Sequence, residues 1–300
     1  MKNVLRLGSR GSRLALIQAE MVRAKLLAHN SKLTIEIVPI QTEGDINKTQ
    51  PLHEIGGKGV FIKTLEQALV QNKIDAAIHS VKDVTATLEP ETSLISFLAP
   101  EARTDCLVVS NNQSYTNLKE LPLGFSIATS SLRRKAILQE QRPDIIIKDI
   151  RGNVQTRIEK CKSGYADGVI LSTAGLIRLN MKSDISFELD PVSFIPAAGQ
   201  GVIGIQVVNC NTNVGELFEA IGCERQKERC FYEHYLVSKV GLDCNYPLGV
   251  YVCIKDSIVS MRVCWATLDC KNYFAEHILG DKHSMIQKID LVIDKIKAVI

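Results

Sequence analysis

Strand-like and helix-like segments alternate along the first two thirds of this 300-residue chain, and this alternation restricts the fold more than any other feature. Val4–Leu7 is typical of a buried strand, and Ser12 is placed to cap a helix with Leu14, Ile17 and Met21 on one face. The β-branched run Leu33–Ile40 follows as a second strand. Strand, helix and strand in this order predict a layered α/β structure whose sheet is parallel in its core.

The same pattern restarts after Pro100 and gives way to a different one after Gly222. Sequence patterns predict further strands at 75–79, 107–109, 125–128, 145–150, 168–172 and 202–208, with helices at 60–72, 132–141 and 154–162. The last segment has a helix at 224–236, antiparallel-type strands at 250–254, 258–263 and 273–278, and a final helix ending at Ile300. We therefore expect two α/β domains followed by a small α+β domain.

Composition excludes several classes of protein. The chain is 45% hydrophobic and 23% charged, which is too apolar for a disordered chain, and its net charge of +3 does not favour a nucleic-acid or membrane surface. It has no apolar run of about 18 residues and no signal-peptide core. Nine cysteines without a C-x-x-C pair predict reduced thiols in the cytoplasm and no metal site.

Two glycine-rich segments resemble nucleotide-binding motifs without meeting their requirements. Gly199–Gly204 fits G-x-G-x-x-G, but β-branched residues follow it where a dinucleotide site needs a helix, so a dehydrogenase is a poor interpretation. Gly56–Gly59 lacks the first glycine and the final Ser/Thr of a phosphate-binding loop. Together with the polar segment Asn47–Gly57 it predicts a mobile lid that contains Lys58, with Phe61 behind it.

Arginines recur where predicted strands turn into predicted helices. The carboxyl ends of parallel strands meet at one edge of a sheet, where ligands bind, and guanidinium groups pair well with carboxylates. We therefore expect a site for a small polyanionic molecule, although any one of these arginines alone could be a solvated surface residue. The arginines are Arg10, Arg133, Arg134, Arg151, Arg157 and Arg178.

Two other residues could take part in chemistry. Asp83 directly follows a buried strand, where a carboxylate could stabilise a developing positive charge, cap a helix or pair with Lys82. Cys244 lies in a loop with flanking Gly and Pro, so its thiol is accessible for covalent chemistry, or it is a spare cysteine. His79 is expected to be a buried strand residue.

Seven segments in the same order resemble the hydroxymethylbilane synthase, or porphobilinogen deaminase, family. The resemblance runs from about Val4 to Gly249 and is specific because the motifs are collinear. The segments are Arg10-Gly11-Ser12 with Leu14-Ala15, Gly56-Gly57-Lys58-Gly59, His79-Ser80-Val81-Lys82-Asp83-Val84, Thr129-Ser130-Ser131-Leu132-Arg133-Arg134, Arg151-Gly152-Asn153-Val154, Pro196-Ala197-Ala198-Gly199-Gln200-Gly201 and the loop of Cys244.

The resemblance implies a transferase of porphyrin and heme biosynthesis that joins four porphobilinogen molecules head to tail and releases ammonia and, finally, linear hydroxymethylbilane. It implies a dipyrromethane cofactor bound to Cys244 through a thioether, and Asp83 as the catalytic residue that stabilises the cation left by ammonia. The arginines above, with Ser12, Lys82, Ser131 and Gln200, would bind the acetate and propionate groups of the growing chain. We expect a cytoplasmic monomer that binds neither nucleic acid nor membrane.

The sequence departs from the family pattern at three places, but every catalytic and binding side chain named above is retained. Leu242-Asp243 stand where two glycines are usual, in a longer segment before Cys244; Thr85 replaces a proline; and Arg13 replaces an uncharged residue. The family architecture implies domain 1 at 1–101 and 202–220, domain 2 at 102–201 and domain 3 at 221–300. Hinges are expected near 100–104 and 194–200.

The alternative is a ligand-binding module. Two periplasmic-binding-protein-like α/β domains with a hinge also describe transport and sensor proteins, which would need an arginine-rich cleft but neither Asp83 nor a covalent cofactor. Such proteins usually carry a signal peptide or a DNA-binding segment, and the sequence has neither.

Overall fold

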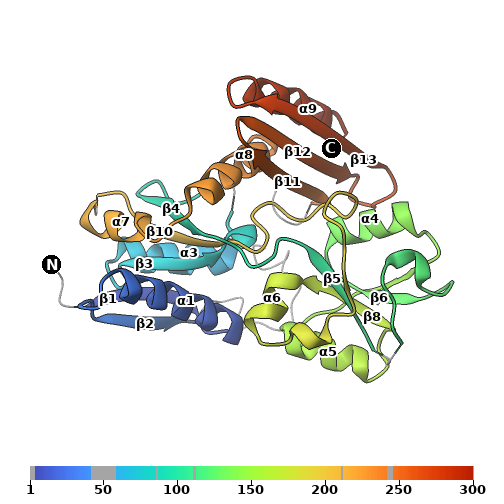
Figure 1. Cartoon of the computed structure of the whole chain (residues 1–300), viewed down its shortest axis with the longest axis horizontal. Coiled ribbons are helices and arrows are strands. Elements are labelled where there is room, and N and C mark those ends of the chain that lie inside the picture. Colours follow the sequence, from blue (N-terminus) through green and yellow to red (C-terminus); the bar gives the residue numbers. More distant parts are fainter. Residues whose placement is uncertain are drawn as a thin grey trace. The chain divides into compact units, whose positions relative to one another are not determined.

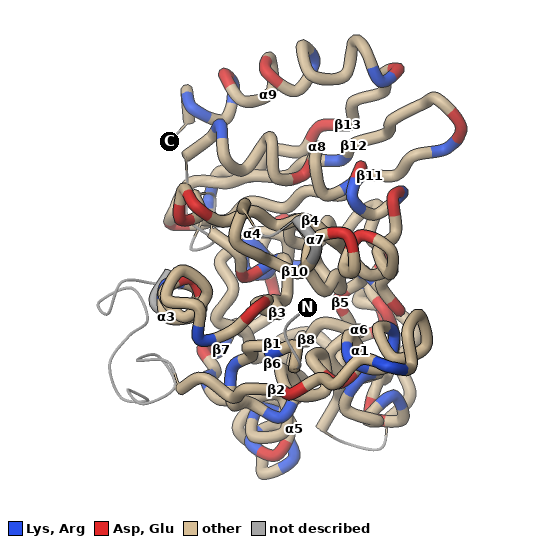
Figure 2. Tube along the Cα trace, turned by 90° about the vertical axis from the view of Figure 1, so that its left-hand side faces the viewer, with Lys and Arg blue, Asp and Glu red and all other residues tan. Residues whose placement is uncertain are grey.

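The computed structural model describes residues 4–41, 59–85, 87–110, 113–210, 212–241 and 246–299. The chain divides into two compact units, the first formed by 1–100 and 202–228 and the second by 101–201 and 229–300 (Figure 1). In both units, Lys and Arg positions lie among Asp and Glu positions (Figure 2).

The first unit is built on a five-stranded sheet in the order β2-β1-β3-β10-β4. Strands β1, β2 and β3 are parallel, and β10 pairs antiparallel with β3 and β4. Its elements are β1 (Leu5–Arg10), α1 (Arg13–His29), β2 (Ile35–Ile40), α3 (Gly59–Val70), β3 (Ala76–Ser80), η1 (Val81–Asp83), β4 (Thr92–Leu98), β10 (Ile203–Val208) and α7 (Thr212–Glu219).

Local sequence explains how α1 and the core of this unit form. The Ser12 side chain accepts a hydrogen bond from the Ala15 amide and so caps α1. Val22 and Leu26, four residues apart on the buried face of the helix, belong to a core that also contains Ile78 and Phe218.

The second unit contains a five-stranded sheet in the order β7-β6-β8-β5-β9 and a separate antiparallel sheet, β11-β12-β13. Helix α8 (Glu224–Val240) begins in the first unit and continues into the second. The remaining elements are β5 (Asp105–Val109), η2 (Leu118–Glu120), β6 (Ser126–Ala128), α4 (Leu132–Gln141), β7 (Ile146–Lys148), α5 (Val154–Lys162), β8 (Gly168–Ser172), α6 (Thr173–Arg178), η3 (Lys182–Asp184), β9 (Phe187–Glu188), β11 (Leu248–Lys255), β12 (Ile258–Ala266), β13 (Tyr273–Asp281) and α9 (Met285–Val299).

The three-stranded sheet buries one face against α8 and α9. Alternate residues of β11, such as Val250 and Val252, share a core with Leu236 of α8 and Ile289 of α9. Ala136 of α4 packs with Ala266 of β12 on the other side.

The structure confirms the predicted fold class, two α/β sheets with a small α+β part, and most of the predicted elements. Strand β4, the two-residue β9 and the short helices α6 and α7 were not predicted, and the strand expected at 145–150 is limited to β7. The three-domain division and the hinges remain predictions beside the two units seen here.

Candidate functional site

The turns that lead into α4, α5 and α6 lie at one edge of the sheet in the second unit. Strand β6 pairs parallel with β7 and β8, so the carboxyl ends of all three point the same way. Ser131 caps α4 and Asn153 caps α5, each through its side-chain oxygen. The predicted grouping of these turns is therefore confirmed for the sheet edge.

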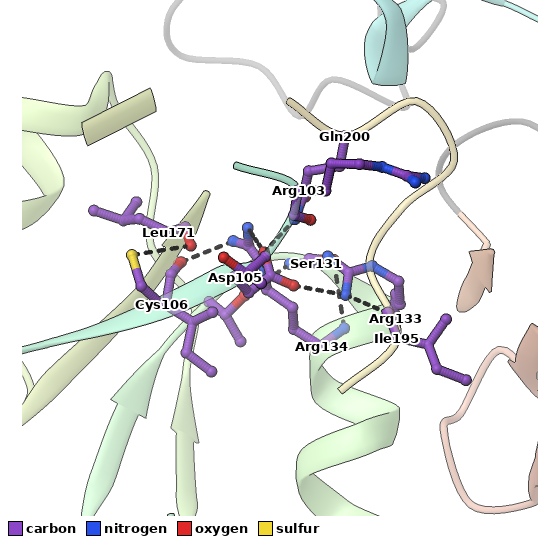
Figure 3. Close-up of polar contacts among 12 residues, drawn as sticks. Arg103, Asp105, Cys106, Ser131, Arg133, Arg134, Leu171, Ile195 and Gln200 are labelled. Carbon is purple, nitrogen blue, oxygen red and sulfur yellow. Dashed lines mark hydrogen bonds and ion pairs between the residues drawn. The ribbon is translucent and has the colours of Figure 1, made fainter. Parts of the chain in front are cut away.

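Two of the predicted arginines are buried and share one carboxylate (Figure 3). Nη1 of Arg133 donates to Oδ2 of Asp105 at 2.8 Å, while Nη2 and Nε of Arg134 donate to Oδ1 at 2.6 and 3.1 Å. Each group also bonds a backbone carbonyl: Nη1 of Arg133 donates to Ile195, and Nη1 of Arg134 donates to Ile170. Both guanidinium groups are thus fixed in orientation.

Asp105 heads β5 and is fully buried. Burial alone would raise the pKa of its carboxyl group, but Arg133 and Arg134 outweigh burial and hold that pKa well below its ordinary value. Two permanently charged guanidinium groups face one carboxylate, so this cluster keeps one excess positive charge. Such a charge favours an anionic ligand.

Gln200 joins this cluster from the connection that precedes β10. Its side-chain amide donates to the Arg103 carbonyl at 3.0 Å and to Oδ1 of Asp105 at 3.2 Å. The flanking Gly199 and Gly201 have φ values of 67° and 82°, a conformation that favours glycine. The predicted strand follows them, where a dinucleotide site would need a helix.

Arg178 holds together the two ends of residues 101–201, the first of the two segments that form the second unit. Its Nε and Nη2 donate to Oε2 of Glu101 at 3.1 and 2.8 Å, and Nη2 also donates to the carbonyl of Gly201 at 2.5 Å. Glu101 and Gly201 are the residues at which the chain enters and leaves this segment. The sequence suggested a ligand-binding role and did not reveal these partners.

Sequence reasoning missed a second buried ion pair, between Arg103 and Glu233 of α8. Burial alone would lower the pKa of Arg103, and the Glu233 carboxylate more than offsets it. Glu233 also accepts the backbone amides of Gly199 and Val252, and Arg103 lies over the ring of Tyr251, 4.6 Å from its centroid. Glu233 therefore joins α8 to both ends of the 101–201 segment, through Arg103 and Gly199, and to β11 through Val252.

Arg151 and Arg157 are more accessible than Arg133, Arg134 and Arg178. Arg151 is exposed after β7, and half-buried Arg157 donates from Nε to the Gly152 carbonyl at 2.7 Å. A Cβ on Gly152 would lie 2.9 Å from the Thr156 side chain, and its φ of 120° favours glycine. The turn therefore depends on this glycine.

The first unit brings four predicted residues to one edge of its own sheet. Strands β1 and β3 are parallel neighbours, so Arg10 at the end of β1 and Ser12 after it lie at the edge where Lys82 and Asp83 follow β3. All four are half-buried. The Val81 amide donates to the Val202 carbonyl at 3.0 Å, which attaches η1 to the chain just before β10.

A chain of buried polar side chains starts at His79, four residues before Asp83. Nε2 of His79 lies 2.9 Å from Oε1 of Gln206, whose amide nitrogen donates to Glu66 at 2.8 Å and to Thr92 at 2.7 Å. Since the Gln206 nitrogen faces two acceptors, its oxygen accepts, and His79 carries its proton on Nε2. Burial lowers the pKa of His79 to about 4, against smaller opposing effects of Gln206 and Asp83, so the ring is neutral. The expected burial of His79 is confirmed.

Part of the predicted site lies outside the described residues. This holds for Cys244, Lys58 and the lid at 47–57, and for the side chain of Phe61, whose backbone belongs to α3. Within the described ranges no group of three metal-ligating residues occurs, and no helix is long and apolar enough to cross a membrane. The described cysteines are all free thiols.

Cations at the carboxyl ends of strands in an α/β fold favour a small anionic ligand. Residues 5–216 match the family model described as "Porphobilinogen deaminase, dipyromethane cofactor binding domain". Because the match covers more than half of the chain, the chain belongs to the porphobilinogen deaminase family, as the motifs indicated. The matched part of the chain is a dipyrromethane cofactor binding domain of this family.

Solved structures resemble the chain weakly. A P235GK mutant of ArgBP from T. maritima is 17% identical with a TM-score of 0.38, covering 76% of this chain and 91% of its own. The periplasmic VFT2 domain of Bordetella pertussis BvgS is 14% identical with a TM-score of 0.43, covering 77% and 93%. Similarity at this level carries no inference about ligands.

Proposed function

We propose that this chain is a hydroxymethylbilane synthase. It joins four porphobilinogen molecules head to tail on a dipyrromethane cofactor, releases ammonia at each addition, and finally releases linear hydroxymethylbilane by hydrolysis. Cys244 holds the cofactor through a thioether, and the enzyme works as a cytoplasmic monomer. The family match over residues 5–216 is the observation that carries this proposal.

The charge at the strand ends fits the cofactor. Dipyrromethane carries acetate and propionate groups, and the Asp105 cluster offers one excess positive charge from Arg133 and Arg134. Exposed Arg151 and half-buried Arg157 follow the neighbouring strand. When bound, the cofactor supplies a nucleophilic pyrrole carbon to which substrate units are added.

The chain's own residues then have separate tasks. Arg133, Arg134, Arg151, Arg157 and Arg178 bind carboxylates from one sheet edge, with Ser131 and Gln200 supporting them. Arg10, Ser12 and Lys82 also bind carboxylates, and Lys58 and Phe61 belong to the lid. Asp83 accepts pyrrole N–H groups and stabilises the substrate cation that forms when ammonia leaves.

Intact-protein mass spectrometry tests the covalent part. Protein purified from cells that make porphobilinogen should carry a two-pyrrole adduct, and Cys244→Ala should abolish it. Cys210→Ala, which removes an exposed free thiol, is the matched control and should keep the adduct. An unmodified wild-type chain would instead favour a ligand-binding module.

Turnover tests the role of Asp83. Asp83→Ala should keep the circular dichroism spectrum of the wild type and lose product formation by at least about a hundredfold, the usual effect of removing one electrostatic stabiliser. Asp294→Ala, on the exposed face of α9, should leave turnover unchanged. Near-normal product formation by Asp83→Ala refutes the catalytic assignment.

A further inference from the structure

We propose that Asp105 is a positioning residue of the ligand site: its buried carboxylate fixes Arg133, Arg134 and Gln200 so that Arg133 presents donors to carboxylates of the bound pyrrole chain. This inference rests on the proposed function and deepens it, because Asp105 itself meets no ligand.

The first support is that one carboxylate gathers three segments distant in sequence. Asp105 heads β5, Arg133 and Arg134 lie in the first turn of α4, and Gln200 belongs to the connection before β10. All three partners were predicted as ligand-binding residues, the arginines from their positions after strands and Gln200 from the family resemblance. The carboxylate that they share was not.

The second support is the direction of the hydrogen bonds. Within the described residues, Arg133 makes its hydrogen bonds through Nη1, to Asp105 and to the Ile195 carbonyl, both at 2.8 Å. Its Nε and Nη2 are left as donors, although the residue is only 4% exposed. Within the described residues, neither nitrogen is among the buried polar atoms that lack a partner, so both are open to solvent and to a ligand carboxylate. Arg134 differs, because it uses Nε, Nη1 and Nη2 within the protein.

The third support is electrostatic. Arg133 and Arg134 are adjacent in sequence and both buried, so without a carboxylate between them their charges would repel in a poorly solvated place. The Asp105 carboxylate offsets the repulsion between the two buried guanidinium groups and leaves the cluster with one net positive charge. An acid at this position therefore sets both the orientation of the arginines and the net charge that an incoming carboxylate meets.

The test compares Asp105→Asn with Asp144→Asn. Asp144 accepts Nε and Nη2 of Arg142 at 2.7 and 2.6 Å beyond the opposite end of α4, so the control breaks a similar pair elsewhere in the unit. Asp105→Asn should raise the KM for porphobilinogen by at least about tenfold, the loss expected for one charge-assisted hydrogen bond. It should also lower the fraction of chains with the Cys244 adduct. Asp144→Asn should change neither.

A purely structural role predicts a different result: less active protein, with the KM of the folded fraction unchanged. If Asp105→Asn does not fold, Gln200→Leu, which removes a neutral donor at 3.2 Å from the same carboxylate, should raise KM by a smaller factor. If the variant that folds has the wild-type KM and the normal amount of adduct, the positioning role is overturned and the proposed function stands. A wild-type chain with neither adduct nor turnover overturns the proposed function, and the positioning role with it.

Discussion

The buried imidazole of His79 should make the first unit sensitive to acid. Its pKa lies at about 4 in the folded chain because burial disfavours the charged ring, against an ordinary value of 6.5. Above pH 6.5 the ring is neutral in the folded and unfolded chains, and His79 adds no pH dependence. As pH falls below 6.5, the unfolded chain takes up a proton that the folded chain cannot accept, so the free energy of unfolding decreases.

The size of this loss follows from the two pKa values. The interval from 6.5 to about 4 corresponds to about 3 kcal/mol, reached in full below the folded value. At about pH 5 the loss amounts to about 2 kcal/mol. His79→Gln removes the titrating ring and keeps an N–H that can reach Oε1 of Gln206, so most of the hydrogen-bond chain to Glu66 survives.

Urea unfolding followed by circular dichroism near pH 8 and near pH 5 measures the effect. Between these conditions the wild type should lose about 2 kcal/mol more than His79→Gln. His283→Gln, which changes an exposed histidine before α9, should behave as the wild type does. Equal pH dependence in the wild type and His79→Gln would refute the argument from burial.

Two further predictions concern packing and capping. A Cβ on Gly8 would lie 2.3 Å from Cδ1 of Ile74, so Gly8→Ala should lower the thermal midpoint by an amount equivalent to about 1–3 kcal/mol, and adding Ile74→Val should restore part of the loss. Asn153 accepts the Thr156 amide at 2.8 Å, so Asn153→Ala should cost about 1 kcal/mol in urea unfolding. Asn153→Asp should cost less because it keeps the acceptor; equal losses in the two Asn153 variants would contradict the cap.

Elements with a complete local signal were predicted well from the sequence. Strand β8 has the predicted bounds Gly168–Ser172, since its apolar run is bounded by Gly and by helix-starting residues. Strand β9 has two residues, too few for any periodicity, and α6 has six, fewer than two helical turns. Their presence depends on tertiary packing that no local pattern reports.

The sequence predicted which types of residue form the candidate site, but it did not predict which residues pair with one another. Arginines at strand ends indicated an anionic ligand, but Arg133 and Arg134 find their carboxylate 28 and 29 residues earlier in the chain. The available signal was a charged residue, Asp105, at the start of the wholly buried strand β5 (Asp105–Val109). A buried acid needs a cationic partner, yet only the strand order shows which cation it meets.

Strand β10 sits between β3 and β4 and comes from a part of the chain beyond residue 200. On the ribosome, β4 therefore emerges long before the strand that joins it to the rest of its sheet, and residues 101–201 are made in between. Translation order thus makes the N-terminal sheet finish late, and the nascent chain must carry an open strand edge until residues 203–208 leave the exit tunnel.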